Sequence, residues 1–229
     1  IPSGAVHIQR SVYLRRETRC DQLTFKSYLD EFLELSIDLL VEADYFDIFE
    51  VRGHTREQRG EYLPPEIEPD RLTLHYLGLD KIHRYTYIRP SMIPSIIAKN
   101  HLRFLVGIPP KGSTVLEINF SLGTSDSHQS EPSKNFVDGY IALKEEISHR
   151  RASDAFVVSS NEQFNDLINR SIADTHLLVT ATSSGPYPYA GVPWFSAPFG
   201  RDGIITAMEL LWINPSFSKA VLYFLAETQ

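Results

Sequence analysis

Apolar and polar residues alternate with a period of two along much of the first half of the chain. The clearest run is Leu33–Leu39, and the pattern resumes at Phe46–Arg52 before it stops at Gly53. This alternation is typical of strands with one buried face. Turn residues bound further predicted strands at Ala5–Leu14, Gln22–Tyr28, Leu72–Leu79, Ile82–Ile88, His101–Ile108 and Thr114–Leu122. Short strands without amphipathic helices between them predict an antiparallel β-sandwich over residues 1–122.

The pattern changes after Leu122. The segment Gly123–Asn135 contains almost nothing apolar, which favours an exposed linker. The following residues, Phe136–Arg151, predict a connecting helix. We therefore assign residues 123–159 to a linker that includes this helix.

From Asn161 onward the apolar period becomes helical. Ser160 and Gln163 fit a capping box at the start of the first helix. A second helix is predicted over Asp202–Trp212. Asn214–Pro215 is a good N-cap and first-turn pair for a third helix.

The apolar pattern of the third predicted helix continues to Gln229. Three amphipathic helices cannot bury their apolar faces on one another, so a helical domain of this kind needs more partners. We therefore expect residues 160–229 to be the first helices of a larger domain, and the chain to be a fragment of a longer protein.

Composition narrows the functional classes. Hydrophobic residues make up 42% and charged residues 22%, which is ordinary for a globular protein. A formal net charge of -7 argues against a nucleic-acid or anionic-membrane partner. Cys20 is the single cysteine, and no run of about 18 apolar residues occurs, so we expect a soluble, cytoplasmic protein. The histidines show no metal-ligand spacing and no glycine-rich phosphate loop is present, so neither a metal nor a cofactor is expected.

Glu50 and Arg52 stand out in the expected strand Phe46–Arg52. Residues two apart in a strand point to the same face. An ion pair between them is the favoured interpretation, and contact with a substrate is the alternative.

The most informative stretch is the loop Tyr189–Gly203, which is dense in proline, glycine and aromatic residues. Trp194 and Phe195 offer flat apolar faces, Arg201 a fork of donors, and Asp202 acceptors at a helix start. This combination suits a sugar, whose ring has apolar faces and a rim of hydroxyls. In the structural alternative, the two aromatic residues fill a core and Arg201–Asp202 is a local ion pair.

Two groups of motifs resemble one known family. Gly191–Gly203 (GVPWFSAPFGRDG), with Leu211–Pro215 and Phe224–Gln229, resembles the bacterial glycogen debranching, amylo-α-1,6-glucosidase-like family. Ala43–Gly53 (ADYFDIFEVRG) and Tyr76–Asp80 resemble the signature of that family's N-terminal β-sandwich domain. The two signatures occur in the expected order along the chain.

This resemblance implies that the helices begin an (α/α)6 barrel related to glucoamylases. By the same likeness, Arg201 and Asp202 would hold the hydroxyls of a glucose, and Trp194 or Phe195 would border its ring. The family's general acid and general base would lie beyond Gln229, in the C-terminal barrel of the same parent chain. No catalytic residue is therefore assigned here.

The carboxylates near the loop agree with the expectation that the catalytic residues lie elsewhere. Inverting hydrolysis needs two carboxyl groups about 6.5–9.5 Å apart across the sugar. Asp202 and Glu209 are separated by two helical turns, about 10 Å along the axis, and Glu209 points away from the loop.

The leading hypothesis is a fragment, inactive by itself, of a cofactor-independent glycoside hydrolase that acts on α-1,6 branch bonds of glycogen or a related α-glucan or oligosaccharide. One alternative is a non-catalytic carbohydrate-binding or scaffold module. Another is a trehalase-like or glucosylglycerol-type hydrolase of α-glucosides.

Overall fold

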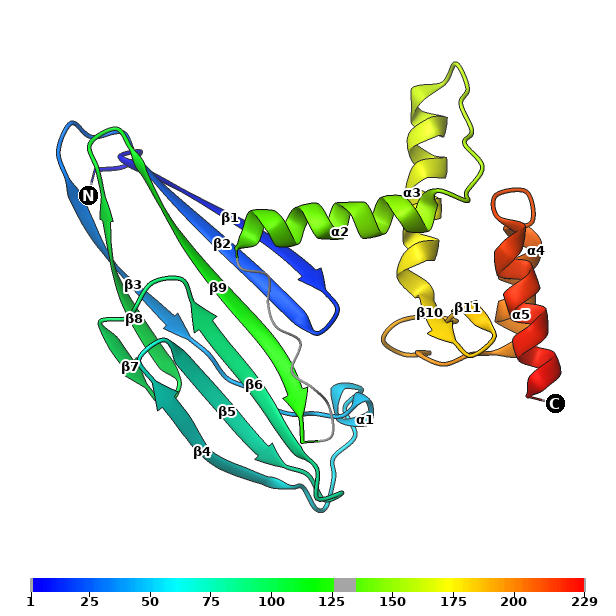
Figure 1. The fold of residues 1–229 in the computed structure, drawn as a ribbon, viewed down its shortest axis with the longest axis horizontal. Coiled ribbons are helices and arrows are strands. Elements are labelled where there is room, and N and C mark those ends of the chain that lie inside the picture. The colour runs from blue at the N-terminus through cyan, green and yellow to red at the C-terminus, as the bar shows by residue number, and fades with distance from the viewer. Residues whose placement is uncertain (1, 126–134, 229) are drawn as a thin grey trace. The chain divides into compact units, whose positions relative to one another are not determined.

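The computed structural model describes residues 2–125 and 135–228, and Figure 1 shows their fold. The elements in chain order are β1 (Val6–Arg15), β2 (Thr18–Ser27), β3 (Leu33–Leu40), α1 (Ile48–Val51), β4 (Glu61–Glu68), β5 (Arg71–Leu77), β6 (His83–Pro90), β7 (Ile96–Ala98), β8 (His101–Ile108), β9 (Ser113–Thr124), α2 (Phe136–Arg151), α3 (Glu162–Leu178), β10 (Val179–Thr182), β11 (Gly185–Pro188), α4 (Gly200–Glu209) and α5 (Pro215–Glu227). Residues 126–134 of the predicted linker lie outside the described residues.

The chain divides into two compact units. One contains Ile1–Phe46 and Thr55–Glu146, and we call it the sandwich unit. The other contains Asp47–His54 and Ile147–Gln229, and we call it the helical unit. The short helix α1 therefore belongs to the helical unit, although it lies between strands of the sandwich in sequence.

The described residues of the sandwich unit form two antiparallel sheets around one core (Figure 1). The larger sheet has the order β1-β2-β9-β6-β5-β4, and the smaller has the order β3-β8-β7. Every second residue of β8, from Leu102 through Phe104 and Val106 to Ile108, is at most 1% exposed. These side chains pack with Leu72 of the opposite sheet in a single cluster. The predicted antiparallel sandwich followed by helices is confirmed.

Helix α2 has the bounds predicted for the connecting helix. Its first residues pack on the sandwich unit, where the ring centroids of Phe136 and Tyr13 are 4.9 Å apart. Glu146 accepts a hydrogen bond from Nη2 of Arg15 at 2.6 Å. This part of α2 therefore lies against β1.

The predicted strand Phe46–Arg52 is wrong, because Ile48–Val51 forms a single helical turn. Asp47 caps that turn, since its carboxylate accepts from the backbone N–H groups of Phe49 and Glu50 at 2.8 and 3.0 Å. The carboxylate of Glu50 in turn accepts from the backbone N–H of Asp47 at 3.2 Å. These reciprocal hydrogen bonds make a capping box, which fixes the turn locally.

Other boundaries also differ from the prediction. The cap of α3 is Asn161, whose side chain accepts from the N–H of Phe164, and not Ser160. Leu178 ends α3, and the chain continues as the hairpin β10–β11, which the periodicity did not indicate. The prediction that Asn214 caps the third helix is confirmed, because its side chain accepts from the N–H of Ser216.

The helical unit has a small core around Tyr187, which is 0% exposed and packs with Ala207 and Val221. The ring centroids of Tyr187 and Phe224 are 4.7 Å apart. A buried hydroxyl, Oγ of Ser218, donates to the carbonyl of Ala207 at 2.6 Å and ties α5 to α4. The hairpin and the last two helices thus hold one another.

A buried polar network joins the segment after α2 to α3 and α5. The Asp154 side chain is 5% exposed, and its Oδ2 lies 2.7 Å from Nε2 of His176. Its Oδ1 accepts from the Asn214 amide at 2.8 Å. A buried carboxylate needs such partners, so this network is a structural anchor of the helical unit.

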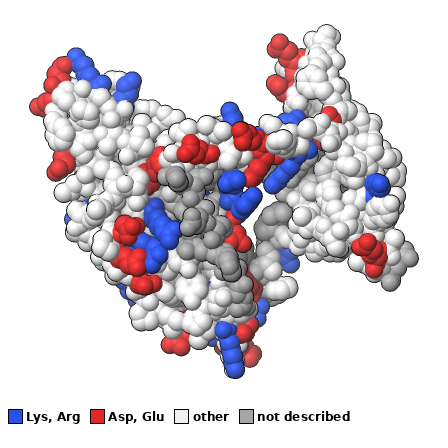
Figure 2. All heavy atoms as spheres, viewed as in Figure 1, with Lys and Arg blue, Asp and Glu red and all other residues white. Residues whose placement is uncertain are grey.

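On the face shown in Figure 2, basic and acidic side chains are interspersed, and neither sign forms a large patch. Among the described residues, no helix combines the length and the apolar character that crossing a membrane requires.

Candidate functional site

The loop between β11 and α4 carries aromatic side chains that stay accessible. Trp194, Phe195 and Phe199 are 53%, 58% and 44% exposed. The rings of Phe195 and Phe199 meet edge to face with their centroids 6.1 Å apart. Within the described residues, neither Trp194 nor Phe195 belongs to the buried core of the helical unit. Both rings are partly accessible to solvent.

The turn that presents Trp194 is held by its own backbone. The N–H of Phe195 donates to the carbonyl of Gly191 at 2.6 Å, and the reverse bond measures 3.3 Å. The hydroxyl of Ser196 donates to the carbonyl of Pro193 at 3.3 Å. The loop is therefore a defined turn in which Trp194 lies at the tip.

Arg201 and Asp202 lie in the first turn of α4, which begins at Gly200 and ends at Glu209 and not at the predicted Asp202 and Trp212. Phe199, the N-cap residue, has no side-chain hydrogen bond to cap the helix. Nε of Arg201 is 3.9 Å from Oδ2 of Asp202, and the two side chains are 85% and 38% exposed. At that separation the pair is weakly coupled, because exposed ion pairs contribute little. Both groups can thus turn to hydroxyls of a bound molecule.

Tyr187 holds the start of α4 in place. Its hydroxyl donates to the carbonyl of Phe199 at 2.9 Å. Gly203 allows this approach, because a Cβ at that position would lie 2.2 Å from the tyrosine oxygen. Burial raises the pKa of Tyr187, and the nearby charge of Asp202 adds to that rise. The phenol therefore stays a neutral donor that fixes the loop end.

Arg52, at the end of the motif Ala43–Gly53, contacts this loop within the helical unit. One of its terminal nitrogens, Nη2, donates to the carbonyl of Pro193 at 3.2 Å. Its guanidinium carbon lies 5.6 Å from the ring centroid of Trp194 and 5.9 Å from that of Phe49. The same-strand geometry expected for Glu50 and Arg52 is therefore wrong, and Arg52 contacts the candidate site.

The exposed residues of the candidate site were proposed from the sequence. Tyr187 and Arg52, which hydrogen-bond to the loop, were not. A signal for Tyr187 was present, since a glycine inside a helix often marks a close approach, and Gly203 does so here. A signal for α1 was also present, because Asp47 and Glu50 have the spacing of a capping box. Nothing in the spacing links Arg52 to Trp194.

Two carboxylates lie in or near the loop. Between residues 189 and 209 the carboxylates are Asp202 and Glu209, which lie in the first turn and at the last residue of α4. That separation does not match a pair acting across one glycosidic bond. Within the described ranges, no group of three or more potential metal ligands occurs.

Comparison with known proteins gives a matching family and similar solved structures. Residues 1–119 match the family described as the N-terminal domain of (some) glycogen debranching enzymes. A solved structure described as "Putative kojibiose phosphorylase from human microbiome" is similar, with 9% sequence identity and a TM-score of 0.58. The similarity covers 81% of this chain and 26% of that chain, so the chain spans about a quarter of its length. No curated protein matches.

The fold defines a class, namely β-sandwich domains that continue into a helical region. The chain belongs to the family of N-terminal domains of glycogen debranching enzymes, because the match covers more than half of its 229 residues. The resemblance to this family is thereby confirmed, and the motifs Ala43–Gly53 and Tyr76–Asp80 lie within the matched residues. The solved structure, at 9% identity, supports the fold alone.

Proposed function

We propose that this chain is part of an enzyme that processes glycosidic bonds of α-glucans, and that its aromatic loop binds a glucose unit at the cleavage position. The observation that carries the proposal is the loop itself. Its half-exposed rings, Trp194 and Phe195, are followed along the chain by the loosely paired charges of Arg201 and Asp202 at the start of α4. Flat apolar faces next to charged donors and acceptors match the two sides of a sugar ring.

The finer proposal is hydrolysis of α-1,6 branch bonds in glycogen or a related glucan. The family match supports it, since that family is named for glycogen debranching enzymes. In this proposal the helices α3, α4 and α5 begin an (α/α)6 barrel, and the general acid and base come from a further part of that barrel. Large exposed apolar side chains of the helical unit support this, among them Leu177 at 77% and Met208 at 66%.

Substitutions in the full-length protein test the role of the loop. Arg201→Ala and Asp202→Ala are expected to lower turnover of a branched limit dextrin by about 10- to 100-fold each, since a charged hydrogen bond contributes about 1.5–3 kcal/mol. The matched control is Arg170→Ala, which breaks an exposed ion pair with Asp174 on α3. Circular dichroism checks that the fold is intact. Unchanged turnover in both loop variants would leave the scaffold or binding-module alternative.

The reaction type needs its own test, because the fold relative is described as a phosphorylase. A hydrolase releases glucose from limit dextrin in the absence of phosphate. A product of glucose 1-phosphate that forms only when phosphate is added would overturn the hydrolysis proposal and keep the glucose-binding one. Comparable turnover of trehalose would favour the trehalase-like alternative.

A further inference from the structure

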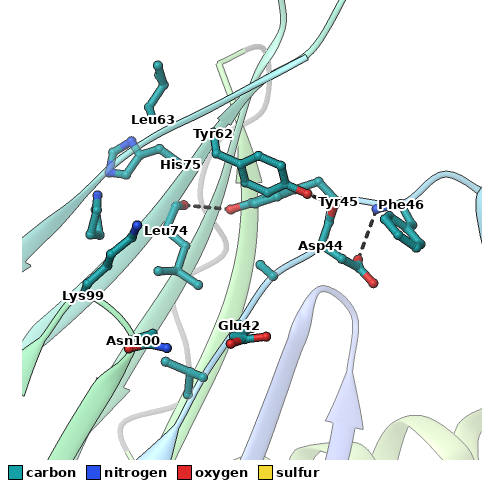
Figure 3. Close-up of a pocket in the computed structure, with 13 residues that line it drawn as sticks. Glu42, Asp44, Tyr45, Phe46, Tyr62, Leu63, Leu74, His75, Lys99 and Asn100 are labelled. Atoms are coloured by element: carbon teal, nitrogen blue, oxygen red, sulfur yellow. Dashed lines mark hydrogen bonds between the residues drawn. The ribbon is translucent and has the colours of Figure 1, made fainter. Parts of the chain in front are cut away.

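A cavity of about 600 Å³ opens in the sandwich unit where β3 ends. The segment 41–46 forms one side, β4 and β5 form a second, and the turn between β7 and β8 forms a third. Figure 3 shows Tyr62 and Asp44 on one side, His75 and Lys99 opposite them, and Glu42 with Asn100 below. The volume falls within the range of small-molecule sites, about 300–1,000 Å³. We refer to it as the sandwich cavity.

The wall of the sandwich cavity is a rigid tyrosine cluster. The backbone of Tyr45 has a positive φ of 50°, a conformation that costs energy for a residue other than glycine. Its hydroxyl holds it there by donating to the carbonyl of Leu74 at 2.8 Å, as Figure 3 shows. Its ring stacks on Tyr76 with centroids 4.9 Å apart. The segment that leaves β3 is thus fixed in place before any ligand arrives.

Tyr62 provides an accessible ring above this cluster. It meets Tyr45 and Tyr76 edge to face, at 6.2 and 5.3 Å between centroids, and remains 50% exposed. Its hydroxyl donates to the carbonyl of Asp44 at 2.6 Å. Arg59 donates to the same carbonyl at 2.6 Å. Tyr62 and Asp44 are therefore held together, the guanidinium carbon of Arg59 lies 5.6 Å from the centroid of the Tyr62 ring, and the exposed part of this ring can contact a ligand.

Charged side chains of both signs line the sandwich cavity. Glu42 and Asp44 carry carboxylates, and Lys99 carries an ammonium, all lining the same space. Glu42 and Lys99 are exposed, and within residues 2–125 and 135–228 neither has a hydrogen bond or an ion pair through its side chain. The two carboxylates disfavour an anion such as phosphate, and the ammonium offsets part of their attraction for a cation. A neutral molecule rich in hydroxyls can use both kinds of group at once.

We propose that the sandwich cavity is a second carbohydrate-binding site, which takes a neutral α-glucan chain apart from the one held at the aromatic loop. The choice of α-glucan rests on the proposed function, whereas the preference for a neutral polyhydroxyl ligand rests on the cavity itself. A branched polymer offers many chain ends. A second contact on the same particle raises the effective concentration of substrate at the first site.

The test measures binding and not turnover. The full-length protein is run on native gels that contain glycogen, and its retardation is compared with that in gels without glycogen. The double variant Glu42→Gln with Lys99→Met is expected to weaken apparent glycogen affinity by roughly tenfold, since it removes charged hydrogen-bonding groups. In the part of the chain that the structure describes, neither side chain has a hydrogen bond or an ion pair, so the fold is expected to stay intact. Tyr62→Ala is expected to weaken affinity at least as much.

The matched control is Tyr28→Ala in the same unit. Tyr28 is 53% exposed and has a cation, Lys26, 5.3 Å from its ring centroid, but it lies outside the sandwich cavity. It is expected to keep the affinity of the unsubstituted protein. Arg201→Ala leaves the sandwich cavity intact, so this variant is expected to keep the retardation by glycogen that depends on the cavity. Retardation of the double variant equal to that of the unsubstituted protein overturns the proposal. Failure of Arg201→Ala to lower turnover would instead contradict the proposed function, in a separate assay.

Discussion

The two units bury their apolar residues to very different extents. In the sandwich unit, Leu102, Phe104 and Ile108 of β8 are at most 1% exposed, within a core to which both sheets contribute. In the helical unit, the buried cluster consists of Tyr187, Ala207 and Val221. Tertiary packing supplies most of the stability of helices, so α3, α4 and α5 have much less of it here than the strands have.

The two units therefore differ in how firmly their packing holds the residues that they expose. The sandwich unit holds its own shape and presents a preformed cavity. The helical unit presents its aromatic and charged residues on a lightly packed scaffold, so single contacts such as those of Tyr187 and Arg52 matter more there. The predictions that follow probe this contrast.

The largest effect is expected for a core truncation in the sandwich unit. Phe104→Ala should lower its free energy of unfolding by about 3–5 kcal/mol, because a large cavity is left in a closed core. Leu222→Ala in α5, at a residue 63% exposed, should change stability by no more than about 0.5 kcal/mol.

Denaturant unfolding of the 229-residue chain separates the two units. Both tryptophans, Trp194 and Trp212, belong to the helical unit, so fluorescence follows that unit. Circular dichroism of the β signal follows the sandwich unit. If Leu222→Ala lowered the free energy of unfolding as much as Phe104→Ala, the two units would not differ in packing as described.

A smaller effect is expected for the support of the aromatic loop. Arg52→Ala removes a hydrogen bond and a cation–π contact, each contributing about 0.5–1.5 kcal/mol. In a Trp212→Phe background, acrylamide should quench Trp194 more strongly after this change. Arg52→Lys should restore little of the protection, because lysine lacks the planar fork.

The control for this experiment is Lys219→Ala. Lys219 lies 5.7 Å from the ring centroid of Tyr223 on α5, so the change removes a comparable contact away from the loop. Equal quenching in the Arg52→Ala and Lys219→Ala proteins would show that Arg52 does not hold Trp194 in place.

The smallest effect concerns a surface turn of the sandwich unit. Hydrogen bonds from Arg84, and then from the backbone N–H of Ile82, lower the pKa of Asp80 to about 2. A lowered native pKa stabilises the fold above the unfolded value of about 3.9, and that contribution is lost as pH falls from about 4 toward 2. In Arg84→Ala the pKa should rise toward its ordinary value, and the acid-side loss of stability should become shallower.

Carboxyl titration by NMR measures this shift directly. Lys81→Ala in the same turn serves as the control and should leave the midpoint of Asp80 low. A midpoint that stays near 2 in Arg84→Ala would assign the shift to the backbone and not to the guanidinium.

The strands were predictable because burial on one face fixes a period of two. Leu33–Leu40 shows this in full, with burial alternating along the whole strand. The edge strand β4 was not indicated, since Pro64 and Pro65 interrupt the pattern. The structure accommodates them with a register shift between Leu63 and Glu66, which an edge strand tolerates.

Local hydrogen bonds explain the misread segment. The alternation at Phe46–Arg52 fits a strand, but the turn at Ile48–Val51 is too short for any helical period to appear. The capping box of Asp47 and Glu50 decided its structure instead. The exposed part of the candidate site could be chosen from composition, whereas the bond from Arg52 to Pro193 joins residues 141 apart and no spacing rule predicts it.

The central claim is that the aromatic loop binds glucose. The most direct test is a crystal structure of the full-length protein soaked with glucose. The account predicts a sugar ring in contact with Trp194 or Phe195, with hydroxyls within about 3.2 Å of both Arg201 and Asp202. Glucose bound only elsewhere, with these four side chains making no contact to it, would contradict the account.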